Sequence, residues 1–79
     1  MRAAKLNSSL IARICYVEAE RVLKITFRDG SLYCYFNVPE VVFDALRAAP
    51  SAGRHYDREI KGRYRCSYDP ERRRFRPAA

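Results

Sequence analysis

Two tyrosines separated by one residue, Tyr33 and Tyr35, lie in an aromatic-rich stretch of the chain. Side chains at positions i and i+2 of a β-strand point to the same side of a sheet, so the two rings would lie side by side. On an exposed surface with cations nearby, such rings could stack on the unpaired bases of a nucleic acid. Inside a domain they would be structural, with hydroxyl groups that need hydrogen-bond partners.

The turn at Asp29-Gly30 decides between these two roles. A two-residue turn would pair Arg28 with Ser31 and place both tyrosines on the same face as Lys24. A three-residue turn with a glycine bulge would pair Phe27 with Ser31 and direct the tyrosines toward the apolar side chains of the preceding strand. A shift of one residue moves every side chain to the opposite face, and the sequence is compatible with both registers.

Charge is the second feature that bears on function. The chain of 79 residues has 16 Lys and Arg against nine Asp and Glu, a formal net charge of +7. Thirteen of the cations are Arg, whose planar guanidinium suits phosphate and stacks on flat rings. Seven cations and two anions fall within residues 61–79. This pattern favours a polyanionic partner, although an arginine-rich proteome would give a similar composition.

We therefore expect a non-catalytic domain that binds nucleic acid mainly through phosphate contacts. The arginines near the C-terminus would contact phosphate, and residues around the tyrosines would contact bases only if the hairpin register exposes them. Arg54 follows Ser51 at the start of a predicted short helix, where free N–H groups could hold a phosphate or Ser51 could simply be an N-cap. The predicted binding residues are Lys24, Arg28, Tyr33, Tyr35, Arg54, Lys61, Arg63, Arg65, Arg72, Arg73, Arg74 and Arg76.

Catalysis and metal binding have little support in the sequence. His55 is the single histidine, and no nucleophile, base and third group stand at a spacing typical of covalent catalysis. The cysteines, Cys15, Cys34 and Cys66, are odd in number and form no CxxC pair, so we expect free thiols and neither a disulfide framework nor a zinc site. The sequence predicts no enzyme activity, no cofactor and no metal.

The sequence has no apolar run of about 20 residues and no signal-peptide pattern. We therefore expect a cytoplasmic protein that does not bind membranes.

The elements that would position these residues follow from hydrophobic periodicity. Residues 11–17, 21–28 and 31–37 are predicted strands, and the Leu23-Ile25-Phe27 alternation is the cleanest of them. The period then changes to that of a helix, with one predicted helix from Pro39 to about Ala49 and a shorter one from Ala52 to about Ile60. The predicted fold is α+β: a three-stranded antiparallel β-meander packed on two short helices. Residues 1–7 would be a flexible start, 8–64 a single domain and 65–79 a basic tail that could include a short edge strand.

Several spaced motifs agree in order with one known family. They are Ser8-Ser9-x-Ile11, Ile14-x-Tyr16, Leu23-x-Ile25-x-Phe27-x-Asp29-Gly30, Tyr33-x-Tyr35, Val38-Pro39, Ala49-x-Ser51-x-Gly53 and Ile60. Over residues 8–64 the chain resembles the KTSC domain, a short module found at the C-terminus of some lysyl-tRNA synthetases and also alone as a small bacterial protein.

The family has no established activity, and its fusion to a tRNA-charging enzyme implies RNA rather than DNA as the ligand. The alternative function is protein–protein docking with incidental basic charge. Docking would require an exposed apolar patch around Phe36, Val42 or Phe43.

Overall fold

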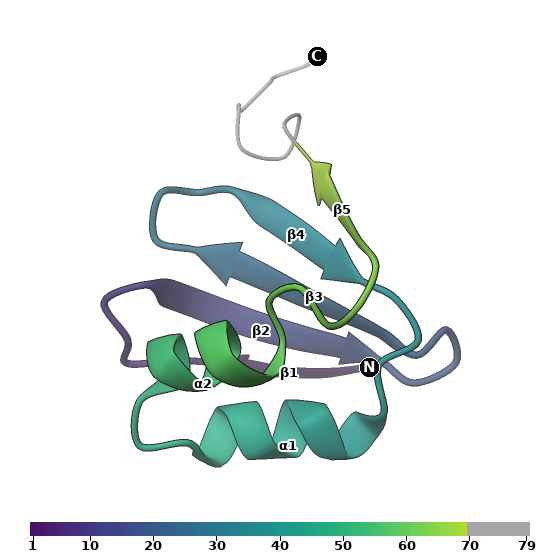
Figure 1. Ribbon diagram of the computed structural model, residues 1–79, viewed down its shortest axis with the longest axis horizontal. Helices are drawn as coiled ribbons and strands as arrows, with labels where there is room; N and C mark the ends of the chain where they lie inside the picture. The colour runs from purple at the N-terminus through teal and green to yellow at the C-terminus, as the bar shows by residue number, and fades with distance from the viewer. Residues whose placement is uncertain (70–79) are drawn as a thin grey trace.

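A five-stranded antiparallel sheet carries two helices on one of its faces (Figure 1). The computed structural model describes residues 1–69. Each strand pairs with the next along the chain, so the strand order is β1-β2-β3-β4-β5. The elements are β1 (Arg2–Lys5), β2 (Ile11–Val17), β3 (Val22–Phe27), β4 (Leu32–Tyr35), α1 (Glu40–Ala48), α2 (Ala52–Glu59) and β5 (Cys66–Asp69).

The α+β class, the three central strands and both helices are confirmed, but the predicted sheet of three strands is wrong because two edge strands extend it to five. The expectation of a flexible start over residues 1–7 is corrected by β1, which pairs with β2 from Arg2 opposite Tyr16 to Lys5 opposite Arg13. The sequence Arg-Ala-Ala-Lys has too little apolar alternation to reveal a strand, and its ladder with β2 holds it in place. At the other edge of the sheet, β5 (Cys66–Asp69) is the short edge strand that was suggested within residues 65–79.

The β3–β4 hairpin adopts the three-residue turn. The N–H of Phe27 donates to the carbonyl of Ser31 at 2.9 Å, and the N–H of Gly30 donates to the carbonyl of Phe27 at 2.9 Å. Gly30 has a φ of 92°, a conformation that glycine adopts at no steric cost. The register therefore places Tyr33 opposite Ile25 and Tyr35 opposite Leu23, on the apolar face that the helices cover.

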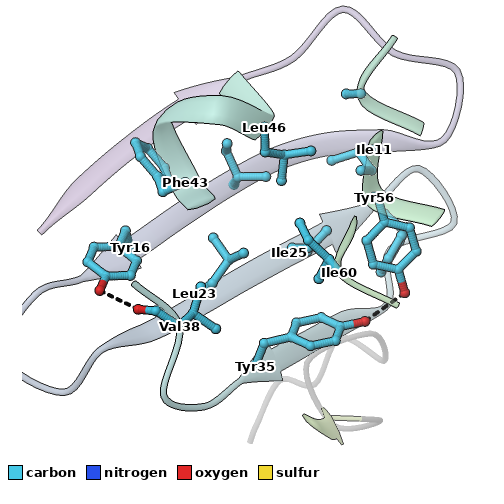
Figure 2. Packing of buried hydrophobic residues seen from close by; sticks show 13 residues of the cluster. Ile11, Tyr16, Leu23, Ile25, Tyr35, Val38, Phe43, Leu46, Tyr56 and Ile60 are labelled. Atoms are coloured by element: carbon cyan, nitrogen blue, oxygen red, sulfur yellow. Dashed lines mark hydrogen bonds between the residues drawn. The ribbon is translucent and has the colours of Figure 1, made fainter. Parts of the chain in front are cut away.

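The connection from β4 to α1 is fixed through both backbone groups of Val38. Its N–H donates to the carbonyl of Arg21 at 2.9 Å. Its carbonyl accepts a hydrogen bond from the Tyr16 hydroxyl at 2.6 Å, a buried contact shown in Figure 2. The Tyr16 ring in turn packs against Phe43 of α1, with ring centroids 6.0 Å apart. The start of α1 is thus tied to β2 by a hydrogen bond and by ring packing.

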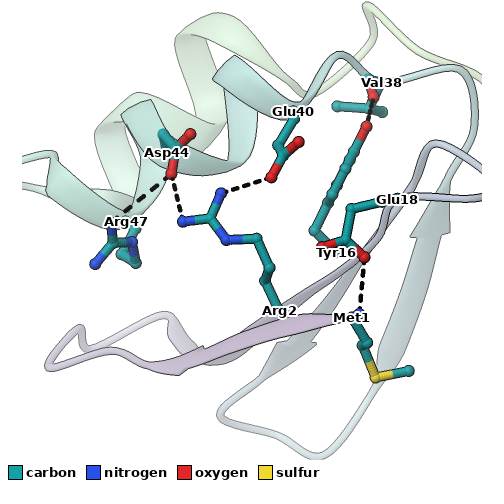
Figure 3. A network of polar contacts seen from close by, with 8 residues as sticks. All are labelled: Met1, Arg2, Tyr16, Glu18, Val38, Glu40, Asp44 and Arg47. Carbon is teal, nitrogen blue, oxygen red and sulfur yellow. Dashed lines mark hydrogen bonds and ion pairs between the residues drawn. The ribbon is translucent and has the colours of Figure 1, made fainter.

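An exposed ion-pair cluster ties α1 to the edge strand β1 (Figure 3). The guanidinium of Arg2 lies 2.8 Å from a carboxylate oxygen of Glu40 and 2.8 Å from one of Asp44. It also lies over the Phe43 ring, 4.8 Å from the centroid. The hydrogen bond from Arg2 holds the pKa of Asp44 below its ordinary value. These contacts give the edge strand a defined position against the helix.

Replacing Tyr16 with phenylalanine should lower the free energy of unfolding by about 1–3 kcal/mol, because the buried Val38 carbonyl loses its donor while the ring packing remains. Urea denaturation followed by circular dichroism measures this change. Tyr68→Phe is the control, since the Tyr68 residue is 41% exposed, and it should change stability by less than about 0.5 kcal/mol. Equal effects of the two substitutions would contradict the role assigned to the Tyr16 hydroxyl.

Candidate nucleic-acid interface

The face of the sheet that points away from the helices is called the open face. Paired residues of antiparallel strands lie on the same side of the sheet, so the register defines its rows across the strands. The row at the centre of the open face runs from Cys15 through Lys24 to Cys34. By register, the open face consists of Ala3, Lys5, Arg13, Cys15, Val17, Val22, Lys24, Thr26, Leu32, Cys34, Phe36, Arg65, Ser67 and Asp69.

Four cations come together on the open face. Lys5 and Arg13 are paired neighbours on β1 and β2, and Lys24 follows on β3. The backbone of Arg65 pairs with that of Phe36: the N–H of Phe36 donates to the carbonyl of Arg65 at 2.9 Å. The guanidinium of Arg65 then lies over the Phe36 ring at 5.9 Å from the centroid. This arrangement gives the open face a cationic surface with one aromatic ring.

The cations of the open face have no ion-pair partner among the side chains of residues 1–68. None of the four forms an ion pair with a carboxylate in this part of the chain. Asp69 is the single acidic residue of β1–β5, and its register position is opposite Leu32 at the far edge. Lys24 and Arg65 belong to the predicted binding set, whereas Lys5 and Arg13 were missed. The alternation of Arg13, Cys15 and Val17 along a predicted strand could have identified Arg13. Lys5 was missed because residues 1–7 were predicted to be a flexible start and not a strand.

A second group of predicted residues surrounds a cleft on the helix side of the sheet, named here the tyrosine cleft. It has a volume of about 630 Å³ and lies between the β3–β4 hairpin, the end of α2 and the segment that leads to β5. Its lining residues are Ser9, Leu10, Phe27, Arg28, Asp29, Ser31, Tyr33, Tyr35, Tyr56, Asp57, Lys61, Gly62 and Cys66.

The tyrosines that line this cleft also pack in the hydrophobic core of the domain. Tyr35 is 2% exposed, and its hydroxyl lies 2.6 Å from that of Tyr56 (Figure 2). Burial raises the pKa of Tyr35 because the phenolate would lose its hydration, and the hydrogen bond with Tyr56 raises it further. Tyr33 is half-buried and packs edge-on against Phe27. The two tyrosines therefore do not share a surface with Lys24.

The remaining predicted residues have varied surroundings. Arg28 is a clamp between the hairpin and the chain before β2, since its guanidinium donates to the carbonyls of Ser8 and Leu6, each at 2.8 Å. Lys61 lies 3.8 Å from Asp57.

Arg63 donates to the carbonyl of Arg58 at 3.2 Å. Arg54 is exposed, and its N–H donates to the Ser51 hydroxyl at 3.5 Å, which makes Ser51 an N-cap. Arg72, Arg73, Arg74 and Arg76 lie outside the described residues.

Comparison with known proteins identifies the family. The profile of the KTSC domain matches residues 7–64. The chain belongs to the KTSC family. The match spans β2, β3, β4 and both helices, so it includes the hairpin that sets the register, whereas β1 and β5 lie outside it.

Relatives of this KTSC domain occur in two contexts. A lysine–tRNA ligase from Nostoc punctiforme is 39% identical over 61 residues, which are 77% of this chain but 11% of the ligase. The chain thus spans about a tenth of that relative. A protein from Tsukamurella paurometabola is 42% identical over 77% of this chain and 91% of its own length. The crystal structure of a KTSC domain protein from Yersinia pestis is similar with a TM-score of 0.79 and 36% identity, over 84% of this chain and 93% of that one.

Within residues 1–69 of this KTSC domain, no three His, Cys, Asp or Glu side chains are grouped so that they could hold a metal ion. The cysteines of this part of the chain, Cys15, Cys34 and Cys66, form no disulfide bond. Neither α1 nor α2 is long and apolar enough to span a membrane.

The stability of the KTSC domain should fall as the pH rises above 10.0, the ordinary tyrosine pKa. The raised pKa keeps Tyr35 protonated in the folded state, while its hydroxyl ionises in the unfolded chain, so each further pH unit costs up to about 1.4 kcal/mol. Urea denaturation between pH 8 and pH 11 should show a shallower decline in Tyr35→Phe than in the wild type. Declines of equal steepness would contradict the assignment.

Proposed function

We propose that this KTSC domain binds single-stranded RNA through its open face and catalyses no reaction. The observation that carries the proposal is the gathering of Lys5, Arg13, Lys24 and Arg65 on the face of the sheet that neither α1 nor α2 covers, with Asp69 as the single acidic residue that the strands place there by register. A cationic surface of this kind attracts phosphate and releases counterions from the nucleic acid.

The geometry suits an extended backbone better than a single anion. Adjacent strands are about 4.8 Å apart, so cations on β1, β2 and β3 form a short track across the sheet. Contacts of this kind fix a phosphate backbone without reading its sequence. Phe36 adds an aromatic ring at the β4–β5 side of the track, where Arg65 already lies over it. The expected binding is sequence-tolerant and depends strongly on salt.

RNA is preferred over DNA because a similar segment occurs within an enzyme that acts on tRNA. The similar protein from Nostoc punctiforme is a lysine–tRNA ligase, and the KTSC-like part makes up about a tenth of it. A module carried by an enzyme whose substrate is a tRNA is well placed to hold that RNA. We extend the same role to this chain.

Protein docking is the weaker alternative. An apolar patch was expected around Phe36, Val42 or Phe43, but Phe43 is 1% exposed and Val42 packs against the core. Phe36 lies on the opposite side of the sheet, beneath Arg65. These three residues therefore offer no continuous apolar surface to a partner.

The test is fluorescence anisotropy of a labelled single-stranded RNA across a salt series, with tRNA and duplex DNA compared. Changing Lys5, Arg13, Lys24 and Arg65 to Gln together should weaken RNA binding at least tenfold at 50 mM salt. The slope of log affinity against log salt should become shallower by about 0.7 for each phosphate that the variant can no longer bind. A control for the location of the charge changes Arg47 and Arg58 on the helices to Gln, which removes two charges instead of four, and it should bind like the wild type.

A third variant, with Arg72, Arg73, Arg74 and Arg76 changed to Gln, separates the contribution of the C-terminal arginines. If RNA affinity falls only in this variant and the open-face variant binds like the wild type, the open face is not the binding surface. If the wild type binds none of the three nucleic acids at low salt, the proposed function is wrong.

A further inference from the structure

We propose that the tyrosine cleft is a second binding site, which takes one unpaired nucleobase. The choice of a nucleobase among planar rings rests on the proposed RNA-binding function, but the site itself follows from the geometry of the cleft. It lies on the helix side of the sheet, so its occupancy can be measured separately from binding to the open face.

The size and lining of the cleft are those of a site for a planar ring. Its volume of about 630 Å³ falls within the range of small-molecule sites, and it exceeds what a water molecule needs. Four aromatic side chains from β3, β4 and α2 line it: Phe27, Tyr33, Tyr35 and Tyr56. Sites for small organic ligands are typically lined by such rings together with a few polar groups.

The rings are held rigidly, which favours stacking. Phe27 packs edge-on against both Tyr33 and Tyr56, with centroids 5.4 and 5.3 Å apart. The rings of Tyr33 and Tyr35 stack with centroids 6.5 Å apart and planes 24° apart, which holds Tyr33 against the buried Tyr35. Because Tyr33 is half-buried, part of its side chain is accessible while its contacts hold the ring in place. A base that stacks there would not have to order a mobile side chain.

Hydrogen-bonding groups stand beside the rings. The Tyr35 and Tyr56 hydroxyls share one hydrogen bond at 2.6 Å, which uses one proton and one lone pair. Each hydroxyl has one proton and two lone pairs, so the pair still offers a donor and acceptors. The edge of a nucleobase carries both donors and acceptors and can use either. A purely apolar ring would leave these groups without a ligand partner.

The charges at the rim favour a neutral ring over an ion. Lys61 is matched by Asp57, 3.8 Å away, and the side chain of Arg28 is engaged by backbone carbonyls. The carboxylate of Asp29 accepts from the N–H and the hydroxyl of Ser31. No single sign dominates, so neither a carboxylate nor a quaternary ammonium group is favoured. An uncharged base meets no electrostatic barrier.

The chain between the two surfaces is cationic. Lys61 lines the tyrosine cleft, Arg63 is exposed two residues later, and Arg65 lies on the open face. Phosphates of one RNA strand could therefore contact this segment between a base in the cleft and the track on the open face. This arrangement links the two sites through the edge formed by β5.

The experiment uses the uncharged nucleosides adenosine and cytidine as probes, with ribose 5-phosphate as the control ligand. They are titrated at 500 mM salt into the ¹⁵N-labelled full chain and followed by NMR. Nucleosides should shift the amide signals of residues 27–35 and 56–62, and ribose 5-phosphate should not. Tyr33→Leu keeps an apolar side chain but removes the ring, and it should weaken nucleoside binding at least about fivefold, as expected for loss of base stacking.

Tyr64→Leu is the matched control, because Tyr64 is also half-buried against the core but does not line the cleft, and it should bind nucleosides like the wild type. The inference is overturned if neither nucleoside shifts these signals, if ribose 5-phosphate shifts them equally, or if Tyr33→Leu binds like the wild type. The open-face variant distinguishes the two proposals. This variant should lose RNA affinity and still bind nucleosides. If the wild type binds RNA but neither nucleoside, the nucleobase site in the tyrosine cleft is wrong and the proposed function of the open face is unaffected.

Discussion

The pairing of Phe27 with Ser31 around Gly30 determines the surface chemistry of the whole domain. This three-residue turn places Tyr33 and Tyr35 on the same face as Leu23 and Ile25, so the tyrosines become part of the core and of the tyrosine cleft. Lys24 lies on the opposite face from Leu23 and Ile25 because side chains alternate along β3. A turn shorter by one residue would instead place Tyr33 and Tyr35 on the face of Lys24 and turn Leu32, Cys34 and Phe36 toward the helices. The separation of a cationic face from an aromatic cleft follows from this one hydrogen-bonded turn.

Both helices pack on the apolar face of the sheet. Phe43 and Tyr56 pack on rings that the strands present, and the hydroxyls of Tyr16 and Tyr35 find partners at Val38 and Tyr56. These buried polar contacts cost little because each is satisfied, and they fix where α1 begins and where α2 lies. Helices on one face are enough to stabilise such a sheet in water, and no helix of residues 1–69 lies on its other face (Figure 1). The uncovered face is where Lys5, Arg13, Lys24 and Arg65 gather.

Sequence reasoning succeeded where one local signal decided the structure. The spacing of Phe43 and Leu46 and the cap at Ser51 predicted both helices closely. It failed at β1, because Arg2–Lys5 carries almost no apolar pattern and is a strand only through its partner β2. The register could not be derived because Asp29-Gly30 suits turns of two lengths, and either length turns apolar or aromatic side chains of β4 toward the helices. Lys24 and Arg65 were therefore predicted as cations but could not be assigned to a common face with Lys5 and Arg13.

The cysteines provide the most direct test of the open face. Cys15 and Cys34 are half-buried in its central row on either side of Lys24, whereas Cys66 lines the tyrosine cleft. The rate of alkylation of each thiol can be measured by mass spectrometry with and without a saturating single-stranded RNA. RNA bound across the open face should slow the alkylation of Cys15 and Cys34 several-fold. Unchanged rates at both residues while the RNA is bound would contradict the account.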